Sequence, residues 1–232
     1  MKAPQKRHIA VFDVDGTIFR SSLFIQLVRH LIEQKKLPES MYRAYAREEK
    51  KWVNREGSYD AYIEAMVDAS EHYFQGLSED DFSEAARFVV EAQWKHVYRY
   101  TRDLLKDLKD KNYYLLAVSH SPKIILDYFC PRLGFDKTYG IIYEVDSKKR
   151  LTGNVVDAHM ILNKANILNR VVSKQSLIFD GSVGVGDSES DISFLSLVEK
   201  PICFNPSSVL YHHAKKQKWK VVVERKDVIY EL

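Results

Sequence analysis

The sequence predicts a doubly wound α/β fold, in which a parallel sheet core carries an inserted all-helical cap. Short apolar runs that end in polar residues recur along the chain, and stretches with helical spacing separate them. Residues 21–99 contain helical patterns only. Buried parallel strands have continuous apolar sequences, and alternation of such strands with helices is typical of doubly wound sheets.

Composition excludes several classes of protein. The 232 residues are 45% hydrophobic and 29% charged, which is typical of a folded domain. The net charge of +3 is too small to indicate a nucleic-acid surface. No segment has the roughly 18 uninterrupted apolar residues of a membrane span, and the N-terminus lacks the apolar run of a signal peptide. Cys130 and Cys203 lie far apart in apolar stretches and are expected to be reduced core thiols. We therefore expect a cytoplasmic protein.

Five apolar runs are predicted as strands of the sheet. They cover His8–Asp13, Tyr113–Ser119, Ser182–Asp187, Pro201–Phe204 and Lys220–Glu224. Because sites gather at the carboxyl ends of parallel strands, the polar ends of the first three are expected to lie together. Asp180 and Gly181 are predicted to form a turn before the third strand. Two β-rich runs within 139–155 flank residues 146–150 and predict a hairpin beside the core.

The helical patterns divide into two groups. In the first, apolar residues recur with helical spacing from Leu23 to Ile32, and further helices are predicted at about 39–53, 58–75 and 78–98. Ser58 and Ser78 are plausible N-caps for the last two. The second group covers 101–110, 121–133, 164–172, 191–199 and 208–217. The predicted domains are a core of residues 1–20 and 100–232 and a helical cap of residues 21–99.

The stretch Asp13-Val-Asp15-Gly16-Thr17 places two carboxylates directly beyond the first strand. Two anions this close need a cation, and Mg²⁺ is the natural one because it takes oxygen ligands and bridges carboxylates to phosphate. One carboxylate can then attack phosphorus, while the other protonates the leaving alkoxide and later activates water. The alternative is that Asp15-Gly16 is only a turn after a strand.

Two further strand ends carry polar groups that suit phosphate chemistry. Asp187 and Asp191 follow the third strand, although acids at a helix N-terminus also have a dipole explanation. Ser119, at the tip of the second strand, is a candidate phosphate ligand. Ser121 and Pro122 predict the start of the next helix, with Ser121 as N-cap and Pro122 at the first helical position.

Lys164 follows Asn163 at the predicted start of a helix, where the positive helix end disfavours a cation. A phosphate-binding role would explain this placement. A solvated surface lysine is the alternative on local sequence alone.

These four stretches, in this order, resemble the four motifs of the haloacid dehalogenase superfamily of phosphatases. The resemblance covers about 8–20 and 101–205 and is to the phosphoserine phosphatase-like branch, subfamily IB, which has a helical cap between its first two motifs. It implies a Rossmann-like core, with residues 21–99 in the position of the cap.

The resemblance also implies roles for individual residues. Asp13 would be the nucleophile and Asp15 the general acid and base, and both would bind the metal, Asp15 through its backbone carbonyl. Asp187 would complete the metal ligands and Asp191 would support them. Ser119 and Lys164 would hold the phosphoryl group. Thr17 and His120 are further candidate phosphate-binding residues, although His120 is also consistent with a structural role.

One position departs from the branch pattern. Phosphoserine phosphatases carry a glutamate nine residues beyond the nucleophile, and the matching residue here is Ser22, which disfavours phosphoserine as the substrate. We expect Mg²⁺-dependent hydrolysis of a small phosphorylated metabolite through an aspartyl-phosphate intermediate, with the cap closing over the substrate. A phosphotransferase with the same intermediate and a non-catalytic scaffold are the alternatives. The oligomeric state stays open.

Overall fold

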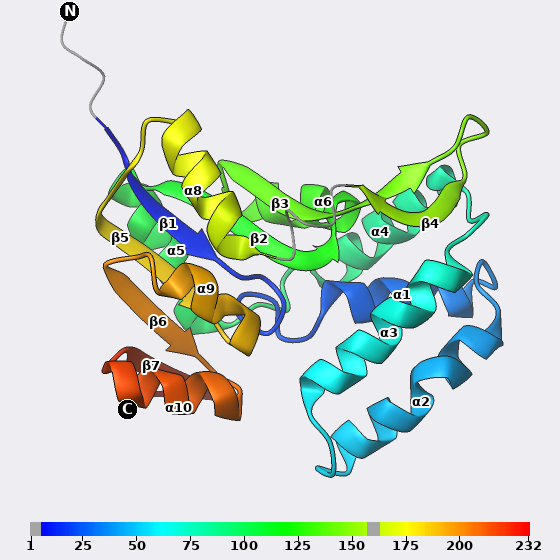
Figure 1. Ribbon diagram of the computed structural model, residues 1–232, viewed down its shortest axis with the longest axis horizontal. Helices are drawn as coiled ribbons and strands as arrows, with labels where there is room; N and C mark the ends of the chain where they lie inside the picture. Colours follow the sequence, from blue (N-terminus) through cyan, green and yellow to red (C-terminus); the bar gives the residue numbers. More distant parts are fainter. Residues whose placement is uncertain (1–5, 157–162) are drawn as a thin grey trace, which may run out of the picture.

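The computed structural model describes residues 6–156 and 163–232 (Figure 1). Within this part of the chain the strands form one eight-stranded sheet in the order β4-β3-β2-β1-β5-β6-β7-β8. In this order, the strands that lie between β4 and β8 run parallel to one another. The edge strands β4 and β8 run antiparallel to their neighbours β3 and β7. The bounds are β1 His8–Phe12, β2 Tyr114–Pro122, β3 Lys137–Val145, β4 Leu151–Val156, β5 Ile178–Gly186, β6 Lys200–Phe204, β7 Lys220–Arg225 and β8 Val228–Glu231.

Helices cover both faces of this sheet, which confirms the predicted doubly wound α/β class. The insertion between β1 and β2 holds α1 Leu23–Glu33, α2 Glu39–Val53, α3 Tyr59–Tyr73 and α4 Glu79–Gln93. The remaining helices are α5 Arg99–Asp110, α6 Lys123–Leu133, α8 Lys164–Lys174, α9 Ile192–Leu195 and α10 Ser208–Gln217, with a 3₁₀ turn at Glu189–Asp191. Ser58 and Ser78 cap α3 and α4 as predicted.

Alternate residues of β1 pack into two separate cores. Ala10 and Phe12 face the core that contains α5, α6 and the helical insertion α1 to α4. Ile9 and Val11 face the other core, with α8, α9 and α10. All four side chains are fully buried. A strand buried on both faces explains why His8–Phe12 is continuously apolar rather than alternating.

The helical insertion is built in two layers. The helices α1 and α4 pack against each other and against α6, and they share one apolar core with the sheet. The helices α2 and α3 pack against each other beyond α1 (Figure 1). The predicted all-helical character of this segment is confirmed. Its separation as a cap domain of residues 21–99 stays a prediction. The assignment of the core also stays a prediction, and its residues 1–5 and 157–162 lie outside the described residues.

The predicted start of α6 is wrong. Strand β2 continues through Ser121 to Pro122, and α6 begins at Lys123 with Pro122 at the N-cap position. Pro122 pairs with Ile141 of β3, and the backbone N–H of Ser121 donates to Ser119 Oγ at 2.8 Å. These contacts hold the backbone extended where the local sequence favours a helix start.

Two other boundaries near β5 also differ from the prediction. This strand begins at Ile178, so Asp180 and Gly181 lie within it and do not form a turn before it. Its pairing with β1 shifts between His8 and Ala10, and Gly181 has a φ of +68°, so the chain bulges here without leaving the sheet. The helix predicted over 191–199 is also shorter, because α9 ends at Leu195.

The hairpin predicted within 139–155 is present as β3 and β4. Its antiparallel strands flank a turn in which Asp146 Oδ1 accepts hydrogen bonds from the backbone N–H groups of Lys148 and Arg150. It extends the main sheet, because β3 also pairs with β2. Cys130 and Cys203 are buried free thiols, as expected. In the part of the chain that the structure describes, no helix has the length and hydropathy needed to cross a bilayer.

Candidate active site

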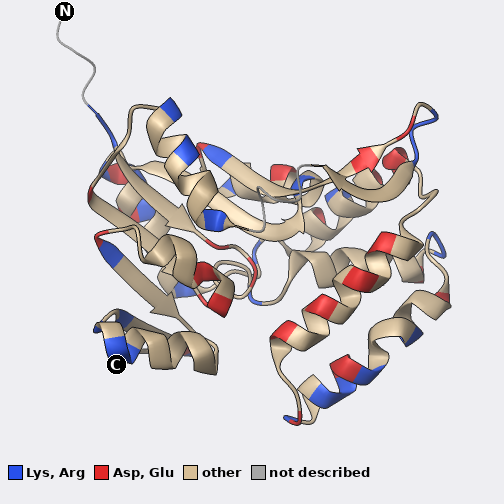
Figure 2. Cartoon of the chain, in the orientation of Figure 1, with Lys and Arg blue, Asp and Glu red and all other residues tan. Residues whose placement is uncertain are grey.

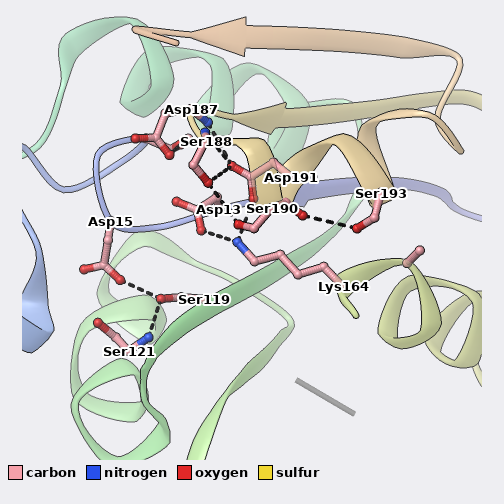
Figure 3. Close-up of polar contacts among 12 residues, drawn as sticks. Asp13, Asp15, Ser119, Ser121, Lys164, Asp187, Ser188, Ser190, Asp191 and Ser193 are labelled. Carbon is pink, nitrogen blue, oxygen red and sulfur yellow. Dashed lines mark hydrogen bonds and ion pairs between the residues drawn. The ribbon is translucent and has the colours of Figure 1, made fainter. Parts of the chain in front are cut away.

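The polar ends of β1, β2 and β5 meet at the carboxyl edge of the sheet, as the sequence predicts. Asp13 and Asp15 follow β1, Ser119 lies near the end of β2, and Asp187 follows β5 (Figure 3). Strand β1 lies between β2 and β5, where the strand order reverses. Such a switch point is the usual location of a ligand site in a doubly wound sheet.

Lys164 is the central cation of this cluster. Its Nζ donates to Asp13 Oδ1 and to Asp191 Oδ1, each at 2.6 Å (Figure 3). The side chain of Lys164 is only 2% exposed, so its interpretation as a solvated surface lysine is wrong. Asn163 caps α8 through its side chain and thereby places Lys164 at the first helical position. Burial alone would lower the pKa of Lys164, but the two carboxylates raise it overall and keep the ammonium charged.

Asp13 is buried, and its two carboxylate oxygens have different surroundings. Oδ1 accepts from Lys164, whereas Oδ2 is buried without a hydrogen-bond partner among the described residues. Burial, together with the neighbouring carboxylates of Asp191 and Asp15, raises the pKa of Asp13 to about 8, although the opposing charge of Lys164 limits this rise. The backbone N–H of Asp13 donates to Val185 O at 2.9 Å, which fixes the residue against β5.

Asp15 is oriented from two elements. Its Oδ1 accepts from the backbone N–H of Leu23 at the start of α1 at 2.5 Å, and its Oδ2 accepts from Ser119 Oγ of β2 at 2.6 Å. Burial raises the pKa of Asp15, while hydrogen bonds from Ser119, Ser121 and Leu23 lower it. The carboxyl group is thus held in one place, next to both Asp13 and the helical insertion.

Asp191 organises the turn after β5. Its Oδ2 accepts from the backbone N–H groups of Asp187 at 2.9 Å and Ser188 at 3.0 Å, and also from Ser188 Oγ (Figure 3). Because its other oxygen bonds to Lys164, the turn and the lysine hold each other in place. Burial and the nearby carboxylates raise the pKa of Asp187 well above its usual value.

The donor set fits a divalent cation. One carboxylate oxygen from each of Asp13, Asp187 and Asp191 lies within 4.8 Å of the others. The unpartnered Asp13 Oδ2 is available to a ligand. Gly16 leaves space beside Asp187, because a Cβ on residue 16 would lie only 2.2 Å from Asp187 Oδ2. Hard divalent cations prefer such oxygen ligands. The carboxylate of Asp15 is outside this cluster, which leaves its backbone carbonyl as the predicted ligand.

The remaining predicted phosphate ligands lie around the same acids. Ser119 and Thr17 are fully buried, and Thr17 Oγ1 donates to Asp187 Oδ1 at 3.3 Å. Ser121 Oγ accepts from the backbone N–H of Phe24, so Ser121 connects β2 to α1 and does not cap α6. His120 lies between the two serines in β2 and is half-buried. Its role as a phosphate ligand stays a prediction.

Sequence reasoning missed Tyr59. This first residue of α3 packs edge-on against Trp52 and Tyr62, and the charges of Asp15 and Asp187 act on its hydroxyl. Burial and these two acids raise the pKa of Tyr59, so its hydroxyl stays protonated. The only local signal was its place after the capping Ser58. No sequence pattern connects the start of the third helix to the end of β1.

The fold and the site define a doubly wound α/β protein with a cluster of buried acids and one lysine at the switch point of its sheet. The family model of the haloacid dehalogenase-like hydrolases matches residues 10–196, and the chain therefore belongs to this family. The match confirms the sequence-based family assignment and spans all the stretches that carried it.

Similar proteins agree with this assignment. The chain is 23% identical over 229 residues to a histidinol-phosphatase of Neisseria meningitidis serogroup C, a match that covers 93% of this chain and 98% of that protein. It is 27% identical over 112 residues to a phosphoserine phosphatase of Archaeoglobus fulgidus, covering 47% of this chain and 32% of the relative. The predicted enzyme class, a phosphoric monoester hydrolase, is confirmed by the family and these relatives.

A solved structure shares the fold. A phospho-aspartyl intermediate analogue of a phosphoserine phosphatase has a TM-score of 0.64, is 20% identical, and matches over 96% of this chain and 96% of its own.

Proposed function

We propose that this protein hydrolyses a small-molecule phosphate monoester through an aspartyl-phosphate intermediate on Asp13, with Mg²⁺ as cofactor. The main support for this proposal is the difference between the surroundings of the two carboxylate oxygens of Asp13. One oxygen is bound to buried Lys164, and the other has no partner among the described residues. A buried carboxylate beside a fixed cation, with one free oxygen, suits a nucleophile.

The cation would be held by Asp13, Asp187 and the backbone carbonyl of Asp15, with Asp191 holding the turn that carries Asp187. When bound, Mg²⁺ would neutralise charge that the carboxylates and the phosphate bring together. The cluster of acidic side chains that fits such an ion supports this assignment.

In the first step a carboxylate oxygen of Asp13 forms a bond to phosphorus while the bond from phosphorus to the ester oxygen breaks. Asp15 gives its proton to the departing alkoxide. The pKa of Asp15, raised by burial, supports this acid role. Lys164 and Ser119 hold the phosphoryl oxygens during transfer, and Thr17 and His120 are further candidates for this contact.

In the second step water attacks the phosphorus of the aspartyl phosphate. Asp15, now ionised, takes a proton from that water, and the bond from phosphorus to Asp13 breaks. Free phosphate leaves, Asp13 is again a carboxylate and Asp15 is again protonated. The hydrogen bond from the backbone N–H of Leu23 keeps Asp15 in reach of both the ester oxygen and the attacking water. The single hydroxyl hydrogen of Ser119, which points to Asp15 in the free enzyme, would turn to the phosphoryl group.

A small phosphorylated metabolite is the proposed substrate. The helical insertion begins beside the site, where the backbone N–H of Leu23 donates to Asp15, and it would obstruct a large substrate. The two relatives described above are named for small phosphate esters, which agrees with this size class. Ser22 uses its hydroxyl to cap α1 and offers no carboxylate to a substrate ammonium group, so phosphoserine stays disfavoured.

The proposal is tested by phosphate release from a panel of phosphorylated metabolites and one aryl phosphate, with and without Mg²⁺. The wild type is expected to release phosphate only with the metal, and Asp13→Asn is expected to be inactive while still folded. An active Asp13→Asn protein would remove Asp13 from the mechanism.

A further inference from the structure

The loop that follows the catalytic acids is held by a residue of α5. Thr101 lies in the first turn of this helix, and its Oγ1 donates to the backbone carbonyl of Thr17 at 2.9 Å. Thr17 Oγ1 in turn donates to Asp187 Oδ1 at 3.3 Å. Both threonines are fully buried. Thr101 is thus connected, through Thr17, to a carboxylate of the acidic cluster.

The hydrogen bond between Thr17 and Asp187 has little margin. An O–H···O bond usually measures about 2.5–3.0 Å, and a contact of about 3.6 Å is no longer a hydrogen bond. At 3.3 Å this bond is therefore lost if Thr17 moves away by only about 0.3 Å. The bond from Thr101 has a normal length and holds the Thr17 carbonyl in place.

Thr101 has a fixed position because Glu224 of β7 anchors the start of α5. The N-cap residue Tyr98 makes no side-chain capping bond. Instead the carboxylate of Glu224 accepts from the backbone N–H groups of Arg99 at 3.1 Å and Tyr100 at 2.8 Å. The Glu224 side chain is only 3% exposed. A carboxylate at a helix N-terminus bonds its free N–H groups and favours its dipole, so the first turn of α5 is held to the sheet.

The same region joins the two connections between the sheet and the helical insertion. The backbone N–H of Tyr98 donates to Ile18 O, and that of Arg20 donates to His96 O, each at 2.9 Å. The loop after β1 therefore pairs with the segment that enters α5. The two segments are positioned as a unit, with Thr101 bonded to Thr17 beside this pairing.

We propose that Thr101 is a positioning residue for the cation site, which acts through Thr17 to keep the Asp187 carboxylate in its ligand position. This inference rests on the proposed function, in which Asp187 holds Mg²⁺. Groups that orient a metal ligand typically contribute about 10- to 100-fold to metal affinity. Because Thr101 acts on the ligand through Thr17, loss of its hydroxyl should weaken Mg²⁺ binding by about 10-fold, the lower end of this range.

The test measures Mg²⁺ binding without turnover. Urea unfolding is followed at increasing Mg²⁺ concentration, and the gain in unfolding free energy gives the dissociation constant for Mg²⁺. No phosphate ester is present, so the Thr17 hydroxyl keeps Asp187 as its acceptor. Thr101→Val should raise this dissociation constant about 10-fold, whereas Thr101→Ser, which keeps the hydroxyl, should stay near the wild-type value. If Thr101→Val does not fold, Thr101→Ala takes its place, because it brings no methyl group against the Thr17 carbonyl.

Two controls separate positioning from a general loss of stability. Ser182 of β5 is fully buried, and its Oγ accepts from the backbone N–H of Glu199 at 2.9 Å. Ser182→Ala therefore also loses a buried bond between a side chain and the backbone, and it should be destabilised but keep the wild-type dissociation constant. In a Thr17→Val background, which already lacks the bond to Asp187, Thr101→Val should not weaken Mg²⁺ binding further.

Three results would overturn the inference while leaving the proposed function standing. They are an unchanged dissociation constant in Thr101→Val, an equal rise in Ser182→Ala, and an equal effect of Thr101→Val with and without the Thr17 hydroxyl. A wild type that gains no stability from Mg²⁺, or that shows no Asp13-dependent turnover of an aryl phosphate, would instead contradict the proposed function itself.

Discussion

Gly16 directly follows the two catalytic acids in the sequence, and in the structure it lies against the side chain of Asp187. Its φ is +80°, and a Cβ at this position would lie 2.2 Å from Asp187 Oδ2 and 3.0 Å from Asp187 Cγ. The substitution Gly16→Ala therefore has two separate effects. It strains the backbone, and it displaces the carboxylate of Asp187 from its present position.

The size of each effect follows from this geometry. An ordinary contact of this kind begins at 3.4 Å, so the Asp187 oxygen must move by about 1 Å. A displacement of about 1 Å in a catalytic group costs on the order of 100-fold in rate. The left-handed backbone conformation costs a non-glycine residue about 1–2 kcal/mol in free energy of folding.

Gly76 provides a control with the same backbone cost. Its φ is +84°, and the structure places no described atom within 4 Å of a Cβ at this position. Gly76→Ala should lose about 1–2 kcal/mol of unfolding free energy and keep its activity.

The two variants are compared by urea denaturation and by kcat/KM over a range of Mg²⁺ concentrations. Both should be destabilised to a similar degree, and only Gly16→Ala should lose about 100-fold in kcat/KM and need more Mg²⁺. A Gly16→Ala enzyme within a few-fold of Gly76→Ala would refute the reasoning that Asp187 must stay in place.

Two further predictions concern buried polar groups. Lys164→Met should cost about 3–5 kcal/mol of unfolding free energy because it leaves Asp13 and Asp191 without their buried cation. Lys220→Met is the control: it removes an ion pair to Glu231 of the same 2.6 Å length, but this pair is largely exposed and its loss should cost under about 1 kcal/mol. Equal losses of unfolding free energy in the two variants, measured by urea denaturation, would refute the distinction between the buried and the exposed ion pair. Burial raises the pKa of Tyr143 to about 12. The unfolded state therefore loses this proton first, and stability should fall by about 2–3 kcal/mol between pH 10 and 12. Tyr143→Phe should not show this loss of unfolding free energy above pH 10. If the unfolding free energies of the two proteins fall in parallel with pH, the prediction for Tyr143 is contradicted.

Local sequence predicted the elements well where tertiary contacts agree with local preference. The predicted bounds 39–53 and 208–217 match α2 and α10, and Ser58 and Ser78 cap their helices. The acids at the ends of β1 and β5 were found because a buried parallel strand leaves its polar end residues at the carboxyl edge of the sheet.

Prediction failed where long-range contacts decide the conformation. Ser121 and Pro122 have the chemistry of a helix start, yet pairing with β3 keeps them extended. At Asp180-Gly181 the sheet absorbs a turn sequence as a bulge. The position of Tyr59 depends on how α3 packs beyond α1, which no short-range pattern encodes.

The phosphorylated residue itself is the most direct test of the mechanism. Enzyme quenched in acid during turnover is reduced with borohydride, which converts an aspartyl phosphate to homoserine, and the modified peptide is located by mass spectrometry. We predict homoserine at position 13 and its absence in Asp13→Asn. Phosphate release with homoserine at another position, or with none, would contradict the aspartyl-phosphate mechanism on Asp13.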